Sequence, residues 1–259
     1  MTTTVPVISI KNLFFGYTPD QPVLYDVCLD IQQTEFIGII GPNGGGKTTL
    51  LKLLLGFLQP WQGSITILGK PATSYPNDIA YVPQALHYDK QFPISVLDLV
   101  LGGRLSKLAW WGAFSKEDKE QALFALEQVQ LIDFKDRPFG TLSGGQAQRA
   151  LIARALAQEP KILLLDESMA CVDIQAEAEI YDVLNKIRSK LTILMVTHDI
   201  RAIIQQVQRV ICVQGKVLTL KPGDVCEHFA LGLYHFPLIL TPDEHLKPVS
   251  HFAKAGFPT

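Results

Sequence analysis

The feature that most constrains this chain is a glycine-rich segment at residues 41–49. It reads Gly41, Pro42, Asn43, Gly44, Gly45, Gly46, Lys47, Thr48 and Thr49, which fits the pattern G-x-x-x-x-G-K-[ST]. An apolar run at 36–40 predicts a buried strand before it, and a leucine-rich run at 50–58 predicts a helix after it. Strand, loop and helix in this order are the context in which the pattern binds the phosphates of a nucleoside triphosphate.

The residue types of this loop match the chemistry of phosphate binding. Its four glycines permit a tight turn in which successive backbone N–H groups point at an anion. The N-terminus of the following helix adds the positive end of its dipole. Lys47 can reach the β- and γ-phosphates, and the Thr48 hydroxyl can ligate Mg²⁺. The loop therefore predicts nucleotide binding, but does not say which kind of nucleotide hydrolase this is.

Length and composition narrow the class of protein. The 259 residues predict one large domain or two small ones, and the net charge of −2 gives no indication of a nucleic-acid partner. No apolar run approaches the roughly 20 residues that span a bilayer, and we expect no signal peptide at the N-terminus. The four cysteines lack C-x-x-C spacing, which is typical of reduced cytosolic thiols.

The order of predicted elements indicates an α/β protein. Strands are predicted at 7–15, 23–31, 36–40, 64–68, 79–82, 161–165, 191–196, 210–213 and 216–220, and helices at 50–58, 116–131, 176–189 and 200–207. Residues 141–158 are predicted to hold a Gly-Gly turn and then a helix. Alternation of apolar strands with helices predicts a parallel sheet with right-handed connections. The helical run at 96–158 interrupts this order and predicts an inserted subdomain.

Two acidic residues follow a fully apolar strand. Asp166 and Glu167 come directly after Ile162–Leu165, so both are expected at the carboxyl edge of the sheet, where ligands bind in open α/β folds. Beside a phosphate loop, Asp166 is expected to hold Mg²⁺, largely through water. Glu167 is expected to activate the attacking water as general base.

A second glycine-containing turn lies far along the chain. It reads Leu142, Ser143, Gly144, Gly145 and Gln146, and it opens a predicted helix. Exposed backbone N–H groups and the helix dipole make it a second anion site. One nucleotide does not need two such loops on one face. The simplest role of this turn is therefore to bind, from the opposite side, the γ-phosphate of a nucleotide held by another copy of the protein. Ser143 also fits the N-cap of the helix, and both roles are compatible.

Together these motifs resemble the nucleotide-binding subunit of ABC transporters from about residue 7 to residue 220. They occur in the family's order: Tyr17 as the aromatic that stacks on adenine, 41–49 as Walker A, 81–84 as the Q-loop, 142–146 as the signature, 162–167 as Walker B, 170–173 as the D-loop and 197–198 as the H-loop. The resemblance implies an α/β fold with a P-loop NTPase (RecA-like) core, an N-terminal antiparallel β subdomain and an α-helical subdomain inserted at about 90–158. It implies an ABC ATPase domain at 1–235 and a C-terminal tail at 236–259.

The resemblance also implies a role for each motif. ATP and Mg²⁺ are the cofactors, and two subunits pack head to tail around two ATP molecules. Lys47 and the rest of the loop at 41–49 hold the phosphates, while Ser143–Gln146 of the second subunit contact the γ-phosphate. Gln84 joins Thr48 and Asp166 at the Mg²⁺. Glu167 activates water, and His198 steadies the transition state.

Four positions depart from the usual family pattern. Ser168 replaces the proline after the catalytic glutamate, the D-loop reads Ala170-Cys171-Val172-Asp173, and Thr34 stands where glycine is common. None of these removes a phosphate or metal contact, so we predict an active ATPase. Gly45 stands where alanine is common, and we expect this difference to change little, since a small residue is what the close backbone approach requires.

Three further segments of the sequence resemble those of the subfamily that imports manganese, zinc or iron. They are Phe92-Pro93-Ile94-Ser95-Val96, Gly103-Arg104 and Val172-Asp173, although the iron–siderophore subfamily shares the Gly-Arg pair. The resemblance implies integral-membrane permease subunits as partners, an extracytoplasmic metal-binding protein indirectly, and a peripheral position on the cytoplasmic face of the membrane. Another ABC importer or an exporter is the alternative. A soluble DNA-repair or translation ATPase fits less well, because long coiled coils, zinc-binding cysteines and a second ATPase unit are lacking.

Apolar residues between 84 and 112 predict a groove for a permease helix. They are Phe92, Leu97, Leu99, Leu101, Leu108, Trp110 and Trp111. If the leucines instead fill the core of the helical subdomain, Trp110-Trp111 is the better docking candidate. Four histidines between 228 and 251 are irregularly spaced, which favours a solvated tail over a metal sensor.

Overall fold

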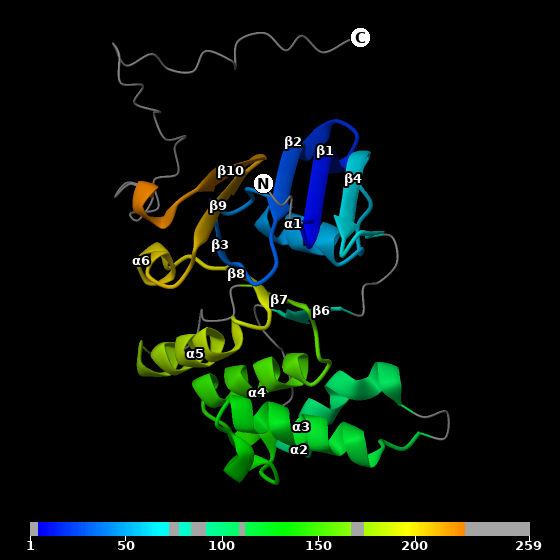
Figure 1. Ribbon diagram of the computed structural model, residues 1–259, viewed down its shortest axis with the longest axis vertical. Coiled ribbons are helices and arrows are strands. Elements are labelled where there is room, and N and C mark those ends of the chain that lie inside the picture. The colour runs from blue at the N-terminus through cyan, green and yellow to red at the C-terminus, as the bar shows by residue number, and fades with distance from the viewer. Residues whose placement is uncertain (1–4, 73–77, 84–91, 109–111, 167–173, 226–259) are drawn as a thin grey trace.

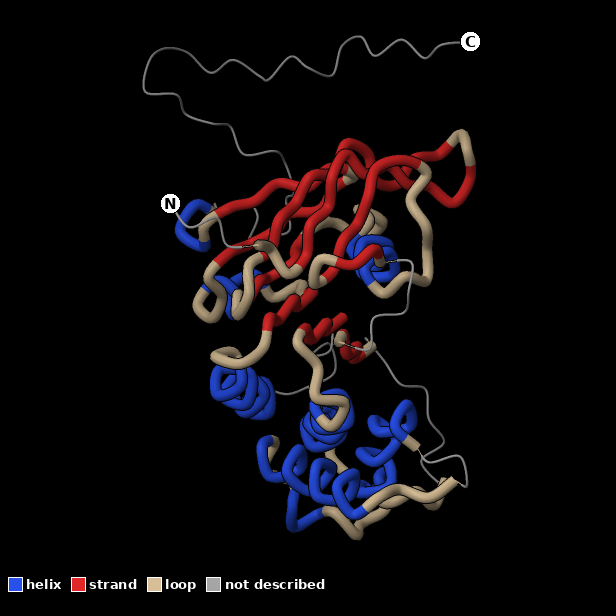
Figure 2. The backbone as a smooth tube through the Cα atoms, turned by 45° about the vertical axis from the view of Figure 1, so that its right-hand side comes forward, coloured by secondary structure: helices blue, strands red, loops and turns tan. Residues whose placement is uncertain are grey.

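Two β-sheets and a group of helices make up the part of the chain that the structure describes. This computed structural model describes residues 5–72, 78–83, 92–108, 112–166 and 174–225. The strands gather in one half of the molecule, and most helices lie in the other half (Figures 1 and 2). The tail expected at 236–259 lies outside the described residues.

The larger sheet is the predicted parallel core. It runs in the order β10-β9-β3-β8-β7-β6, and only β10 is antiparallel to its neighbour among these described strands. Its strands are β3 (Phe36–Ile40), β6 (Ile79–Val82), β7 (Ile162–Asp166), β8 (Thr192–Val196), β9 (Arg209–Gln214) and β10 (Lys216–Leu220). The strands β3, β7 and β8 are buried at every position, which explains their unbroken apolar runs.

Alternate residues of these strands enter two separate cores. Phe36 and Ile40 face the core that contains α5 (Ile174–Ile187), α6 (Ile200–Ile204) and the helical part. Ile37 and Ile39 face the core that contains α1 (Lys47–Leu54) and the smaller sheet. Because side chains alternate along a strand, one short apolar segment buries both faces of the sheet.

The smaller sheet is the predicted N-terminal antiparallel unit. Its order is β2-β1-β4-β5, with β1 at Ile8–Thr18, β2 at Gln21–Ile31, β4 at Gln62–Ile67 and β5 at Lys70–Pro71. The two strands extend further toward each other than the predicted ranges 7–15 and 23–31, because Thr18 pairs with Gln21 and leaves only two residues in the turn. The strand therefore carries Tyr17 to the end of the sheet.

Several predicted helices end before their apolar runs do; the helix predicted at 116–131, for example, is α3 (Lys116–Gln128). Two others show the reason. The helix α1 ends at Leu54 rather than at residue 58, because Gly56 adopts a φ of 74° that breaks the helical path. The helix α6 ends at Ile204 rather than at residue 207, although Val207 is still buried. In both cases burial continues beyond the hydrogen-bonded helix, so the apolar pattern overstates its length.

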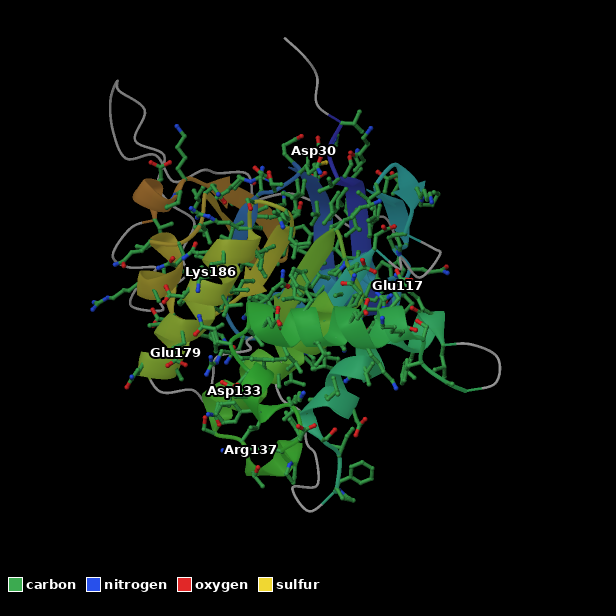
Figure 3. The ribbon with its side chains drawn as sticks, turned by 60° about the horizontal axis from the view of Figure 1, so that its bottom comes forward. Asp30, Glu117, Asp133, Arg137, Glu179 and Lys186 are labelled. Atoms are coloured by element: carbon green, nitrogen blue, oxygen red, sulfur yellow. The ribbon has the colours of Figure 1, made fainter. Side chains whose placement is uncertain are left out.

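The helical part follows the predicted order. It contains α2 (Val96–Leu101), α3 (Lys116–Gln128), α4 (Gly144–Leu156) and the 3₁₀ turns η1 (Gly102–Lys107), η2 (Ile132–Phe134) and η3 (Phe139–Thr141); a further turn, η4 (Pro222–Asp224), follows β10. Ser115 and Asp118 form the capping box that starts α3. Charged side chains such as Glu117, Asp133 and Lys186 are exposed (Figure 3).

Gly103 and Arg104 join the helices of this part. The Arg104 side chain is only 2% exposed, and its guanidinium donates to Asp118 at 2.9 Å and to the carbonyl of Ala157 at 3.0 Å. A Cβ on Gly103 would lie 2.1 Å from the carbonyl oxygen of Arg154. The pair that resembles the metal-import subfamily is therefore a packing feature of the helical part.

This packing predicts opposite outcomes for two adjacent substitutions. Gly103→Ala should lower the free energy of unfolding by about 1–3 kcal/mol, because the backbone of α4 must shift. Gly102→Ala is the matched control, since a Cβ there would lie 3.6 Å from the nearest atom, in Arg154, and φ is −55°. It should leave stability unchanged or raise it slightly. Chemical denaturation of both variants checks this, and equal stabilities would contradict it.

Candidate functional site

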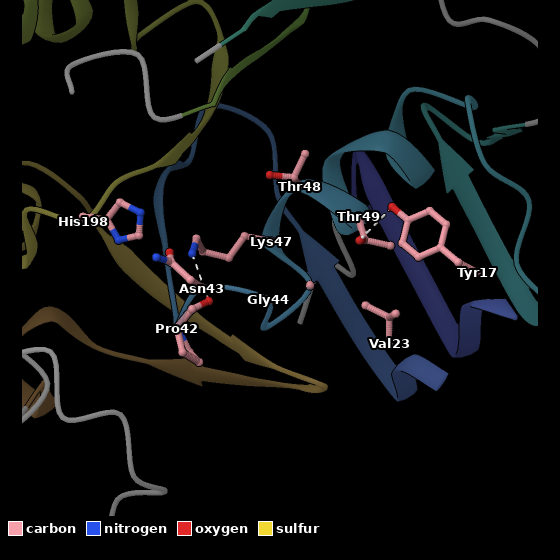
Figure 4. Close-up of a pocket in the computed structure, with 10 residues that line it drawn as sticks. Tyr17, Val23, Pro42, Asn43, Gly44, Lys47, Thr48, Thr49 and His198 are labelled. Carbon is pink, nitrogen blue, oxygen red and sulfur yellow. Dashed lines mark hydrogen bonds between the residues drawn. The ribbon is translucent and has the colours of Figure 1, made fainter. Parts of the chain in front are cut away.

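A cavity of about 620 Å³ opens over the glycine-rich loop (Figure 4). It is lined by Tyr17, Val23, Pro42, Asn43, Gly44, Gly46, Lys47, Thr48, Thr49 and His198. Residues from the N-terminal sheet, the loop, α1 and the end of β8 thus meet around one space. The structure brings together Tyr17, the loop and His198, which the sequence predicts as parts of one site.

The loop is shaped by its backbone. Gly44 and Gly46 have φ angles of 77° and 103°, which favour glycine. Gly46 is the N-cap of α1 and has no side chain that could cap the helix. The first N–H groups of the helix can therefore donate hydrogen bonds to an anion. Lys47 is 5% exposed, and its ammonium donates to the carbonyls of Gly41 at 2.9 Å and Pro42 at 3.1 Å. Its charge is therefore held at the loop.

The hairpin of β9 and β10 packs directly against this loop. A Cβ on Gly45 would lie 2.6 Å from the carbonyl oxygen of Val213, and one on Gly41 would lie 2.1 Å from the same atom. The N–H of Gly215 donates to the carbonyl of Gly45 at 3.0 Å. The expectation that Gly45 is equivalent to alanine is wrong for this structure, because a methyl group would push a backbone carbonyl away.

Tyr17 lies beside the loop on the side of the smaller sheet. Its hydroxyl is 3.2 Å from the Thr49 hydroxyl, and the residue is 60% exposed. Its ring packs edge-on against that of Phe15, with 5.3 Å between the ring centroids, and the Phe15 centroid lies 6.2 Å from that of Trp61. Trp61 has no motif that marks it in the sequence. It covers Gly16, where a Cβ would lie 2.5 Å from the indole, so the three aromatic rings hold this end of β1 in place.

Asp166 ends β7, and His198 follows the neighbouring strand β8. Asp166 pairs with Val196, the last residue of β8, as expected for adjacent parallel strands. The N–H of Thr197 donates to the carbonyl of Ile39 at 3.2 Å, and the Thr197 hydroxyl accepts from the N–H of Asp199 at 3.0 Å. These bonds fix the turn that carries His198 into the cavity. Asp166 is 3% exposed and lies one strand further from β3.

Tyr81, at the start of the segment that resembles the Q-loop, contacts Asp166 at this sheet edge, and no motif in the sequence indicates this contact. Its hydroxyl donates to Oδ2 of Asp166 at 3.2 Å. Burial, together with the negative charge of Asp166, raises the pKa of the Tyr81 hydroxyl, so it stays protonated and remains a donor. Only its place on β6, one strand from β7, could have indicated this contact in advance.

The second glycine turn starts α4, away from the residues that line the cavity. Ser143 is the N-cap, its hydroxyl accepts from the N–H of Gln146 at 3.3 Å, and the Gln146 side chain accepts from the N–H of Ser143 at 3.0 Å. The predicted capping role is confirmed. Ser143 and Gly144 are exposed, whereas Gly145 is buried. Within one chain, this turn is not part of the cavity.

Several predicted residues lie outside the described part of the chain. They are Gln84, Glu167, Ser168, Ala170–Asp173, Trp110, Trp111 and the four tail histidines. Of the proposed docking residues that are described, Phe92 is 61% exposed and Leu101 is buried. Leu97 and Leu99 are partly buried and pack on the helical core, which supports the alternative that the leucines fill this core.

Comparison with known proteins decides the family. A family model described as "ABC transporter" matches residues 24–170. The chain belongs to this family. Its similarity to ATP-binding subunits, together with the phosphate loop, makes it an ABC-type ATPase.

Relatives within the family align with most of the length of this chain. A probable metal transport system ATP-binding protein of Chlamydia trachomatis is 48% identical, over 74% of this chain and 81% of the relative. The manganese transport system ATP-binding protein MntB of Listeria monocytogenes is 42% identical, over 83% of this chain and 90% of the relative. An ABC transporter assigned to the metal-chelate type, solved in an inward-facing conformation, superposes with a TM-score of 0.77 at 28% identity and covers 88% of each chain. Both relatives and the solved structure are named for the transport of metals or metal chelates.

The position of Tyr17 predicts a base-specific effect on nucleotide binding. Tyr17→Ala should weaken ATP binding about tenfold, since stacking on an aromatic ring contributes roughly 1–3 kcal/mol per base. Tyr17→Phe keeps the ring, loses only the contact with Thr49, and should bind nearly as wild type. Calorimetric titration with ATP measures this, and tripolyphosphate, which has no base, should bind all three proteins equally. Equal ATP affinity for Tyr17→Ala would contradict the stacking role.

Proposed function

We propose that this ABC ATPase powers the import of a transition metal, either manganese, zinc or iron, through a separate membrane permease. The observation that carries the proposal is the cavity in which the loop 41–49, Tyr17 and His198 meet, in a chain whose relatives are metal transport ATP-binding proteins. An iron–siderophore importer is the nearest alternative, because it shares Gly103-Arg104.

The residues around the loop suit ATP with Mg²⁺. Lys47 and the N–H groups at the start of α1 bind the phosphates, and Tyr17 stacks on adenine. Thr48, Gln84 and Asp166 supply hydroxyl, amide and carboxylate oxygens, which are the ligands that Mg²⁺ prefers. When bound, Mg²⁺ neutralises charge on the β- and γ-phosphates.

Hydrolysis then needs a base and donors around the γ-phosphate. Glu167 takes the proton of the attacking water, and His198 contacts the γ-phosphate from the end of β8. Because phosphoryl transfer is catalysed mainly by positioning and charge stabilisation, donors on the opposite face are needed as well. Ser143, Gly144, Gly145 and Gln146 of a second subunit supply them in a head-to-tail homodimer.

The partners follow from the transport role. Among the residues that the structure describes, every helix is too short or too polar to cross a bilayer. The path for the metal is formed by integral-membrane permease subunits, to which a periplasmic or extracellular metal-binding protein delivers it. The ATPase domain spans 1–235 with a tail at 236–259, and it works at the cytoplasmic face of the membrane without a nucleic-acid partner.

Replacement of the proposed base should separate binding from hydrolysis. Glu167→Gln keeps the size of the side chain but cannot accept a proton, so it should lower the ATP hydrolysis rate at least ~100-fold while ATP still binds. Phosphate release and equilibrium titration measure the two properties. Hydrolysis at the wild-type rate would show that Glu167 is not the base.

The same variant tests which substrate is transported. Cells that carry the chain with its native permease should accumulate manganese, zinc or iron, and Glu167→Gln should abolish this accumulation. Elemental analysis of washed cells measures it, with an iron–siderophore complex as the competing substrate. Uptake of the siderophore complex alone, or stimulation of the ATPase by DNA or ribosomes instead of by a metal-loaded binding protein, would contradict the proposal.

A further inference from the structure

The Tyr81 hydroxyl donates a hydrogen bond to the Asp166 carboxylate. We propose that Tyr81 is a positioning residue that fixes the Asp166 carboxylate in the orientation needed to hold Mg²⁺. This inference rests on the Mg²⁺ site proposed above and names a further residue that sets its strength.

The register of the sheet makes the contact specific. β6 and β7 are parallel neighbours (Figure 1), and in their register Tyr81 pairs with Leu164. Asp166 lies two residues after Leu164, so its side chain is on the same face of the sheet as that of Tyr81. This diagonal spacing is within reach of a long aromatic side chain, and the hydroxyl lies 3.2 Å from Oδ2.

The surroundings of the pair keep the contact in one geometry. Asp166 is 3% exposed, and Tyr81 packs against the core that contains Leu164. The Tyr81 hydroxyl donates its one proton to the Asp166 carboxylate, which can only accept. Because the bond holds Oδ2, it also sets the plane of the carboxylate and therefore the direction of Oδ1.

Partners of this kind control metal affinity in proteins. Ligating carboxylates are themselves commonly hydrogen-bonded, and loss of such a partner typically costs about 10- to 100-fold in metal affinity or activity. The alternative is that the bond only satisfies two buried polar groups. The two roles differ in one measurable property, because only the positioning role affects the Mg²⁺ concentration that hydrolysis requires.

Tyr81→Phe tests the proposal, since it removes the hydroxyl and keeps the ring. The matched control is Tyr181→Phe on α5, where the buried hydroxyl finds no hydrogen-bond partner among the described residues. For full-length wild type and both variants, the Mg²⁺ concentration at half-maximal ATP hydrolysis and the Kd for ATP, in excess Mg²⁺ and in EDTA, are measured.

Tyr81→Phe should need about tenfold more Mg²⁺ and bind ATP more weakly in excess Mg²⁺, with its Kd in EDTA unchanged. Tyr181→Phe should match wild type in all three measurements. An unchanged Mg²⁺ requirement for Tyr81→Phe, or equal losses of ATP affinity in Mg²⁺ and EDTA, would overturn the positioning role. Wild-type hydrolysis that needs no Mg²⁺ would instead overturn the proposed metal site, and this inference with it.

Discussion

The contact between the phosphate loop and the β9–β10 hairpin is the constraint on which the nucleotide site depends. The carbonyl of Val213 occupies the space that a Cβ on Gly41 or Gly45 would need, and Gly215 donates to the carbonyl of Gly45. Only glycine permits this approach at both positions. The loop is therefore held through its own backbone, and the Lys47 ammonium is anchored on two of its carbonyls.

Parallel strand order explains why distant motifs meet at this loop. The strands β3, β8, β7 and β6 are neighbours and run the same way, so their carboxyl ends share one edge of the sheet. The loop follows β3, His198 follows β8, and Asp166 ends β7. Alternating burial along the same strands anchors this edge in two cores at once, which keeps the functional residues on a rigid support.

Most of the fold could be predicted from the sequence, because apolar periodicity and cap residues mark the elements directly. Helix ends were less accurate, since burial at Val207 continues past the helical hydrogen bonds. Motifs revealed the loop, Asp166 and His198, but not Trp61 or the contact of Tyr81 with Asp166, because both depend on neighbours that are distant in sequence. The Gly45 error has the same cause, since the obstructing atom belongs to Val213.

We propose that the cavity is half of a site that Ser143–Gln146 of a second subunit completes. Light scattering of the slow Glu167→Gln variant tests it most directly. With ATP, this variant should double in mass, whereas Glu167→Gln with Ser143→Arg should remain a monomer. At protein concentrations too low for dimers to form, both should bind ATP with the same Kd. ATP-dependent dimers of the double variant, or a loss of ATP binding by its monomer, would contradict the account.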